Sequence, residues 1–296
     1  MTQITRGLND STLSWSPDGE WITVINYDDK TGWDRVYLIH YTGHSEHFLS
    51  NWNNCHEGHP EWSPDSRWVI FTCTDGGIHH INIDGTNLYQ IMKTDSYPPF
   101  IDLSPNGEWM IFNWSMMNIS SHEVYPLPFN YGLVYDNIGW TPDSQWILFA
   151  EGDDPEKRRF YKVRPEGTDL QSTQIISPSS WSPDGHLLVS ESNGATFLAD
   201  TNGANPQLFT YPAEKPQWSP DGKWIAFIRR DADSAKLYRL QPDKSDLQRL
   251  DSAKHDVTSF AWSPKWVGMS FHGILLMMFS TLTIGILILG HCIRSY

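Results

Sequence analysis

Histidines concentrated in one part of the chain are the residues whose types and spacing could do chemistry. Seven of the twelve fall between residues 40 and 80, namely His40, His44, His47, His56, His59, His79 and His80. The run Cys55-His56-Glu57-Gly58-His59 also places three kinds of metal ligand close together. The turn expected at His44 and the loop expected at His59 put these side chains at opposite ends of the strands. We therefore expect no metal site and no cofactor.

The motifs of nucleophilic and phosphate chemistry are missing from the sequence. It contains no Gly-x-Ser-x-Gly, no His-Glu-x-x-His and no phosphate-binding glycine loop. The paired carboxylates Asp28-Asp29 and Asp153-Asp154 fall in polar stretches between strands, where solvated turns are expected. No catalytic residue is assigned on these grounds.

The elements that must position these side chains repeat along the chain. Each copy has an apolar strand end, then Trp-Ser-Pro-Asp-Gly or a relative of it, then a second strand that usually opens with another Trp. The anchors are 37 to 47 residues apart and are Trp15, Trp62, Leu103, Trp140, Trp181, Trp218 and Trp262. A period near 40 residues built of strands predicts the blades of a β-propeller.

The sixth copy shows the unit most clearly. Ser219-Pro220-Asp221-Gly222 is a turn, because proline presets φ and glycine accepts positive φ. Residues 224–228 and 236–240 read as the next two strands, and 247–250 as an outer one. We predict an all-β fold with six, or seven, four-stranded antiparallel blades, distorted at the third copy, where Leu103 replaces the anchor Trp. Residues 3–6 look like an outer strand that either pairs at the last blade or belongs to a longer array.

The segment Trp218 to Phe227, Trp-Ser-Pro-Asp-Gly-Lys-Trp-Ile-Ala-Phe, resembles the TolB-like propeller repeat. The resemblance covers roughly residues 1–265. It implies a six- or seven-bladed propeller with a binding or gating role, and it assigns no particular activity.

Residues 267–290 contain no Asp, Glu, Lys or Arg and are strongly apolar. As a helix they would extend roughly 36 Å, enough to cross a bilayer core of about 30 Å, so we predict one C-terminal transmembrane helix. A buried helix, or a strand pair that finishes the seventh blade, is the alternative. The expected domains are the propeller (1–258), a juxtamembrane remnant of a further repeat (259–266), the transmembrane helix (267–290) and a short tail (291–296).

The composition restricts partners and location. A net charge of −14 argues against nucleic acid as a partner, because phosphate binding needs basic patches. Three cysteines form no disulfide framework, so we expect no disulfide. The N-terminal residues carry no secretory signal, so the propeller is expected in the cytoplasm if Met1 is the true start, and exported otherwise.

The function predicted from these observations is binding or scaffolding by a membrane-anchored propeller that recognises a protein or peptide. The expected binding face is formed by the loops before each first strand, where aromatic and polar side chains gather. Its candidate residues are His56, Glu57, His59, Tyr97, Phe100, Tyr135, Asp136, Tyr211 and Glu214. The alternative is a propeller enzyme, a metal-dependent lyase or hydrolase that uses the central channel.

Overall fold

A computed structural model of the chain shows an all-β fold. It describes residues 2–6, 13–42, 45–50, 55–95, 100–128, 138–151, 159–173, 178–192, 194–201, 205–230, 234–250, 257–262, 274–280 and 283–289. Two compact units are formed, the first from residues 1–124, 263–275 and 282–296, and the second from 125–262 and 276–281. Each unit is described by itself below.

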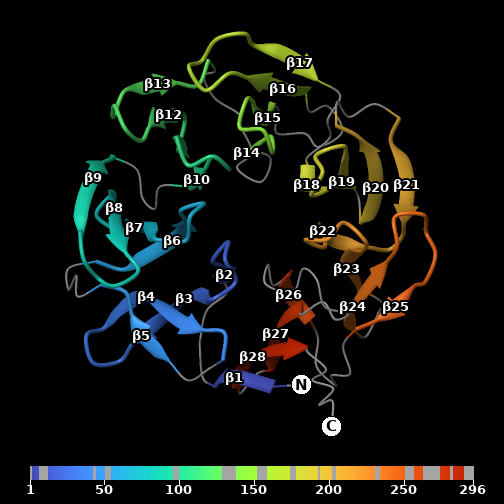
Figure 1. Cartoon of the computed structure of the whole chain (residues 1–296), viewed down its shortest axis with the longest axis horizontal. Coiled ribbons are helices and arrows are strands. Elements are labelled where there is room, and N and C mark those ends of the chain that lie inside the picture. Colours follow the sequence, from blue (N-terminus) through green and yellow to red (C-terminus); the bar gives the residue numbers. More distant parts are fainter. Residues whose placement is uncertain are drawn as a thin grey trace. The chain divides into compact units, whose positions relative to one another are not determined.

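Six blades each consist of four consecutive antiparallel strands, which confirms the six-bladed propeller with four-stranded blades (Figure 1). Blades 1 to 3 contain β2 (Leu13–Trp15), β3 (Trp21–Asp28), β4 (Trp33–His40) and β5 (Glu46–Phe48); β6 (Glu57–Trp62), β7 (Trp68–Cys73), β8 (Gly77–Asn82) and β9 (Tyr89–Lys93); β10 (Ile101–Leu103), β11 (Trp109–Phe112), β12 (Ser115–Asn118) and β13 (Val124–Pro126). Blades 4 to 6 contain β14 (Gly139–Trp140), β15 (Ile147–Glu151), β16 (Arg159–Val163) and β17 (Gln171–Thr173); β18 (Pro178–Trp181), β19 (Leu187–Ser192), β20 (Ala195–Asp200) and β21 (Gln207–Thr210); β22 (Glu214–Trp218), β23 (Ile225–Arg230), β24 (Ala235–Leu240) and β25 (Gln248–Arg249).

A further sheet has the strand order β1-β28-β27-β26, in which β1 spans Thr2–Arg6, β26 Val257–Trp262, β27 Ile274–Ser280 and β28 Thr283–Leu289. The N-terminal strand pairs antiparallel with β28, with Gln3 opposite Leu287. The expected outer strand at residues 3–6 therefore pairs at the last sheet.

The predicted C-terminal transmembrane helix is not shown, because its described residues form β27 and β28. Thr283, Ile284, Ile286 and Ile288 are β-branched residues, which suit a strand better than a helix. Among the described residues, no helix is long and apolar enough to cross a membrane.

Hydrogen bonds inside each first turn explain why the Ser-Pro-Asp-Gly sequence recurs. In blade 6 the Ser219 hydroxyl donates to the Asp221 carboxylate at 2.7 Å and accepts from the Trp224 backbone N–H at 2.9 Å. Gly222 follows with a φ of 69°. Blades 1, 3, 4 and 5 repeat the hydroxyl contact, with Asn106 in place of Asp in blade 3. The sequence motif thus fixes the geometry of the turn that joins the first strand of a blade to the second.

The core lies between successive blades within each unit. The second strand of blade 2, Trp68–Cys73, is almost entirely buried, because neighbouring blades cover both of its faces. Val36 and Leu38 of blade 1 pack with Val69 and Phe71 of blade 2 in unit 1. Val189 of blade 5 packs with Trp218 and Phe227 of blade 6 in unit 2. The anchor tryptophans therefore fill the space between blades.

Two expectations change at the level of blades. Cys55 and Cys73 form a disulfide within blade 2, whereas no disulfide was expected. The pairing of β6 with β7 sets Glu57 opposite Cys73 and so brings Cys55 close, a proximity that a separation of 18 residues does not reveal. Blade 3 keeps all four strands, and its irregular sequence shortens them to three or four residues each.

Candidate binding cleft

The predicted site residues of unit 1 are largely engaged within the blades. The Glu57 carboxylate is buried and accepts hydrogen bonds from the Arg35 guanidinium at 3.2 Å, the Val36 backbone N–H at 2.9 Å and the Ser50 hydroxyl. Burial raises the pKa of Glu57, while these hydrogen bonds act in the opposite direction. Its role in the structure is to hold blade 1 against blade 2.

His56 contacts the carboxylate of Asp34 through Nδ1 at 2.7 Å and packs edge-on against Trp33. His59 is exposed with a positive φ of 44°, and Phe100 is half-buried. Within the described residues, no three His, Cys, Asp or Glu side chains are grouped so that they could hold a metal ion.

Two predicted site residues lie in unit 2, Tyr211 in the loop that leads into blade 6 and Glu214 at the start of β22. Tyr211 is 65% exposed. Glu214 forms an ion pair with Arg230 at 3.3 Å. The remaining three candidates, Tyr97, Tyr135 and Asp136, lie outside the described residues.

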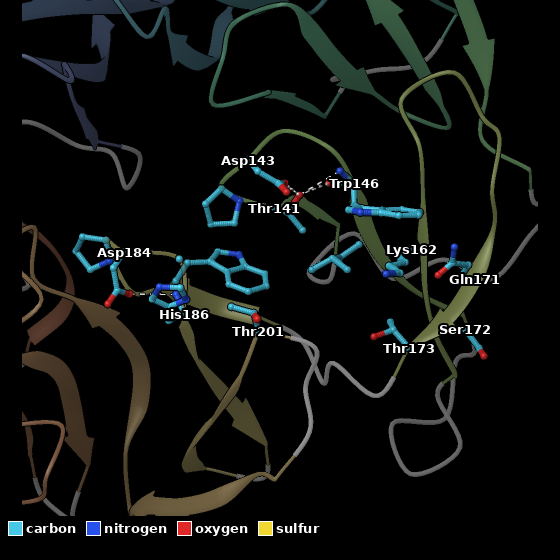
Figure 2. A pocket seen from close by; sticks show the side chains of 15 residues that line it. Thr141, Asp143, Trp146, Lys162, Gln171, Ser172, Thr173, Asp184, His186 and Thr201 are labelled. Carbon is cyan, nitrogen blue, oxygen red and sulfur yellow. Dashed lines mark hydrogen bonds between the residues drawn. The ribbon is translucent and has the colours of Figure 1, made fainter.

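A cleft of about 920 Å³ opens between blades 4 and 5 of unit 2 (Figure 2). Its lining combines two tryptophans with hydroxyl, amide and charged side chains: Thr141, Pro142, Asp143, Trp146, Leu148, Lys162, Gln171, Ser172, Thr173, Trp181, Pro183, Asp184, Gly185, His186 and Thr201. Leu148 of blade 4 packs with Leu188 and Ala199 of blade 5, and Trp181 packs against them. A shared apolar cluster therefore holds together the two blades that border the cleft.

The first turns of the two blades supply one side of this cleft. Thr141 donates to Asp143 at 2.5 Å, and Asp143 accepts from the Gln145 backbone N–H at 3.0 Å. In blade 5, Asp184 accepts from the Ser182 hydroxyl at 2.6 Å, a bond that lowers the pKa of Asp184. Both carboxylates are thus held in place by their own turns.

Strands β16 and β17 of blade 4 line the cleft as well. The Lys162 ammonium lies 4.1 Å from the centre of the Trp146 ring, and the Arg164 guanidinium lies 3.9 Å from it. Gln171 pairs with Lys162 across the two strands. Figure 2 shows Lys162 and Gln171 on one side of the cleft and Asp184 and His186 on the other. The cleft therefore carries one ammonium group, that of Lys162, and two carboxylates, those of Asp143 and Asp184.

The cleft differs in position from the face that the sequence predicted. The turns with Asp143 and Asp184 follow the first strands of blades 4 and 5, whereas Tyr211 precedes the first strand of blade 6 and Glu214 begins it. Turns after a first strand and loops before one lie at opposite ends of the strands. The structure consequently shows its described cleft at the turn end, and the predicted loop residues lie at the other end.

Sequence comparison finds partial relatives. An uncharacterized protein from Agrobacterium fabrum is 28% identical over 214 residues, which are 67% of this chain and 59% of that protein. The Tol-Pal system protein TolB of Xanthomonas campestris pv. campestris is 34% identical over 80 residues, 25% of this chain and 18% of TolB. The chain thus matches less than two thirds of the length of these relatives. No protein-family model matches the chain.

Solved propellers share the fold at low identity. An oligogalacturonate lyase from Vibrio parahaemolyticus has a TM-score of 0.70 at 14% identity and covers 92% of this chain and 87% of its own. The Swd1 β-propeller domain from Myceliophteria thermophila has a TM-score of 0.70 at 13% identity, with 96% and 97% covered. TolB from Acinetobacter baumannii has a TM-score of 0.52 at 17% identity, with 80% and 62% covered. The chain is thus similar to TolB over a quarter of its length and shares the β-propeller fold with these structures.

Two carboxyl groups in unit 1 of this β-propeller have strongly raised pKa values. Glu61 in β6 and Asp102 in β10 occupy equivalent positions, each directly before the anchor of its blade. Burial and the nearby Asp102 charge raise the pKa of Glu61 to about 8, and burial raises the pKa of Asp102 to about 7. A carboxyl group with a pKa near neutrality can donate or accept a proton in catalysis.

Sequence reasoning missed the residues of the cleft and this carboxyl pair. The second tryptophan of each copy, including Trp146, was treated as the start of the second strand. The sequence carries no local signal for the cleft, because its lining comes from two copies of the repeat and Lys162 is its only Lys or Arg side chain.

Proposed function

We propose that this TolB-like propeller is a binding protein that recognises a protein or peptide segment. The observation that supports it is the cleft between blades 4 and 5, which is open to solvent and combines two tryptophans with hydroxyl and amide groups. Large aromatic side chains beside a few oriented polar groups are typical of recognition surfaces. Similarity to a Tol-Pal system protein is consistent with a role among partner proteins.

The loops before the first strands remain a second predicted surface, and photocrosslinking separates it from the cleft. A benzophenone amino acid would replace Ser172, which is exposed in the cleft, or Tyr211, which is exposed at the loop end. We expect the same defined adduct from Ser172 in independent extracts of the native cell, and its loss in a Trp181→Ala background. Adducts from Tyr211 alone would transfer recognition to the loops, and adducts from neither position would contradict the binding function.

A propeller enzyme is the second candidate, because Glu61 and Asp102 combine raised pKa values with equivalent positions on successive first strands. The solved lyase structure shares only the fold with this chain. Turnover of an acidic oligosaccharide or a peptide substrate that is lost in Glu61→Gln would favour the enzyme. Elemental analysis of the full chain would then show whether such an enzyme carries a bound metal ion, as a metal-dependent lyase or hydrolase requires.

Membrane attachment through residues 267–290 stays a prediction from their length and lack of charge. Alkaline carbonate extraction of membranes from the native cell distinguishes the two arrangements. A membrane-embedded segment keeps the full chain in the pellet. A strand pair within the last sheet releases it into the supernatant.

A further inference from the structure

We propose that the Cys55–Cys73 disulfide is a redox-sensitive lock on the junction between blades 1 and 2 of unit 1. In the oxidised chain the bond holds residues 55–57 in place between the two blades. In the reduced chain this segment separates from blade 1 more often. The lock is independent of the cleft in unit 2 and goes beyond the proposed binding function.

The first observation is that two residues next to the disulfide attach blade 2 to blade 1. His56 contacts the Asp34 carboxylate at 2.7 Å. The Glu57 carboxylate accepts hydrogen bonds from the Arg35 guanidinium at 3.2 Å and from the Val36 backbone N–H at 2.9 Å. A buried ion pair needs accurate placement of both partners, because separating them leaves a buried charge without compensation. The junction therefore depends on how firmly residues 55–57 are held.

The second observation is a break in the pairing that would otherwise hold this segment. The register of β6 against β7 shifts between Gly58 and Glu61, so only two residue pairs lie between the break and the start of β6. Before β6, His56 and Thr74 exchange two hydrogen bonds of 3.1 and 3.2 Å. The disulfide adds a covalent attachment to the end of β7 at this point. It therefore reinforces the part of blade 2 that the strand ladder holds least.

The third observation is the burial of the bond within the junction. Cys55 and Cys73 are 1% and 0% exposed and lie in one apolar cluster with Val36 and Leu38 of blade 1 and Phe71 of blade 2. A reductant must attack one sulfur directly, so it reaches the bond only when the junction opens. Opening permits reduction, and the loss of the bond favours opening. Because this coupling is reciprocal, the lock has two self-consistent states, oxidised and closed or reduced and open.

The reaction that opens the lock is exchange with a dithiol. A thiolate of the dithiol attacks one sulfur of the bond and forms a mixed disulfide, and the other cysteine leaves as a thiolate that takes up a proton. The second thiol of the dithiol then displaces the remaining cysteine. The dithiol ends as a disulfide, and its two electrons and two protons leave Cys55 and Cys73 as free thiols.

The test uses the full chain and hydrogen exchange followed by mass spectrometry, before and after reduction with dithiothreitol. Peptides that include residues 33–38 and 55–58 report on the junction, and peptides that include β23 of blade 6 are the internal reference. We expect exchange at the junction at least about tenfold faster after reduction, because the 18-residue loop that the bond closes regains conformational freedom. The reference should not change, and reoxidation with oxidised glutathione should restore slow exchange.

Cysteine variants separate the bond from other effects of the reductant. The double variant Cys55→Ser, Cys73→Ser should show fast exchange at the junction without dithiothreitol. Cys292→Ser is the matched control, since it removes the one cysteine that the bond does not use, and it should behave as the parent. If the double variant does not fold as judged by circular dichroism, the oxidised and reduced forms of the parent chain decide the question alone.

A second variant tests the coupling in the other direction. Asp34→Asn removes the charged partner of His56 and leaves both cysteines in place, so it should speed reduction of the folded chain by dithiothreitol about two- to fivefold. Asp169→Asn is the matched control, because it removes the same charge from a partner of Arg164 in unit 2. Its rate of reduction should equal that of the parent.

Several results would overturn the proposal. Equal exchange at the junction in oxidised and reduced chains would show that the bond does not hold the segment. Equal acceleration of the reference peptides would make the bond a global stabiliser instead of a lock on one junction. A bond that resists dithiothreitol in the folded chain would not be redox-sensitive, and equal reduction rates in Asp34→Asn and Asp169→Asn would refute the coupling between the bond and blade 1.

Discussion

The anchor tryptophans allow the contribution of one hydrogen bond between blades to be measured. Trp62 and Trp218 occupy equivalent positions, and each is 7% exposed. The Trp62 indole N–H donates to the backbone oxygen of Ser14 in the preceding blade at 3.3 Å. The Trp218 indole N–H is buried, and no acceptor lies within reach of it among the described residues. Replacement of each tryptophan by Phe removes a similar side-chain volume, but it removes a hydrogen bond only at Trp62.

The expected free energies follow from that difference. Loss of the larger ring costs each variant about 2 kcal/mol for transfer and cavity. Trp62→Phe also loses a hydrogen bond worth about 1 kcal/mol, while the Ser14 oxygen keeps the Thr23 hydroxyl as a donor at 3.2 Å. Trp218→Phe instead removes a buried unpaired N–H, whose desolvation costs about 1–3 kcal/mol. We expect unfolding free energies lowered by about 3 kcal/mol for Trp62→Phe and by about 1 kcal/mol for Trp218→Phe.

Urea unfolding followed by circular dichroism measures both variants against the parent. Trp262→Phe is the matched control, because Trp262 is also 7% exposed and its indole N–H donates to the Gln217 backbone oxygen at 3.2 Å. It should resemble Trp62→Phe, and the gap of about 2 kcal/mol should appear as roughly 4–8 °C in melting temperature. A cost for Trp218→Phe as large as for the other two would refute the assignment of the difference to the indole N–H.

Three further predictions concern backbone room, protonation and the disulfide. Gly107→Ala should lower the unfolding free energy more than Gly185→Ala in denaturant titration. Both glycines have positive φ (72° and 71°), so each substitution costs about 1 kcal/mol or more, but only the methyl group added at Gly107 would meet Pro64, at 2.9 Å. Equal losses in the two variants would contradict this close approach. Because the pKa of Glu61 is raised from 4.5 to about 8, the folded state retains a proton that the unfolded state releases. The unfolding free energy should therefore fall as pH rises from about 4 to 8, and it should fall less steeply in Glu61→Gln. Parallel pH profiles of the parent and the variant would refute this. Thiol titration in urea should find one free thiol before reduction and three after, because Cys55 and Cys73 are joined; three without reductant would exclude the bond.

The sequence predicted the blades because their signals are local. The hydroxyl of Ser219 bonds Asp221 two residues away and Trp224 five residues away, so the turn is encoded within one short segment. The apolar second strands, such as Trp68–Cys73, are buried on both sides and are equally visible as continuous apolar runs. Six repetitions of the same local code were sufficient to predict six four-stranded blades.

The C-terminal segment shows where local signals fail. Residues 267–290 are apolar and uncharged, a pattern shared by a transmembrane helix and by buried strands. The structure pairs β28 with β1, so the partner of Leu287 is Gln3, at the other end of the sequence. A pattern within one segment cannot reveal a pairing with residues so distant.

The site depended still more on tertiary structure. No sequence motif links Glu57 with Arg35, yet the packing of blade 2 on blade 1 buries them as an ion pair. Lys162 and Trp181 are contributed to one cleft by different blades, and only the stacking of those blades brings them together. Glu61 and Asp102 likewise acquire raised pKa values only in the folded chain, where their partial burial on two successive first strands disfavours the charged carboxylates.

The sequence alone therefore determined the repeating unit, its turns, its anchor tryptophans and the all-β class, because hydrogen bonds and hydrophobic alternation over a few residues encode each of them. Only the tertiary structure decided the disulfide, the strand partners of the C-terminal segment and the cleft between blades 4 and 5. Each of these depends on the distance between residues of different strands or blades, and that distance is set by how the blades pack.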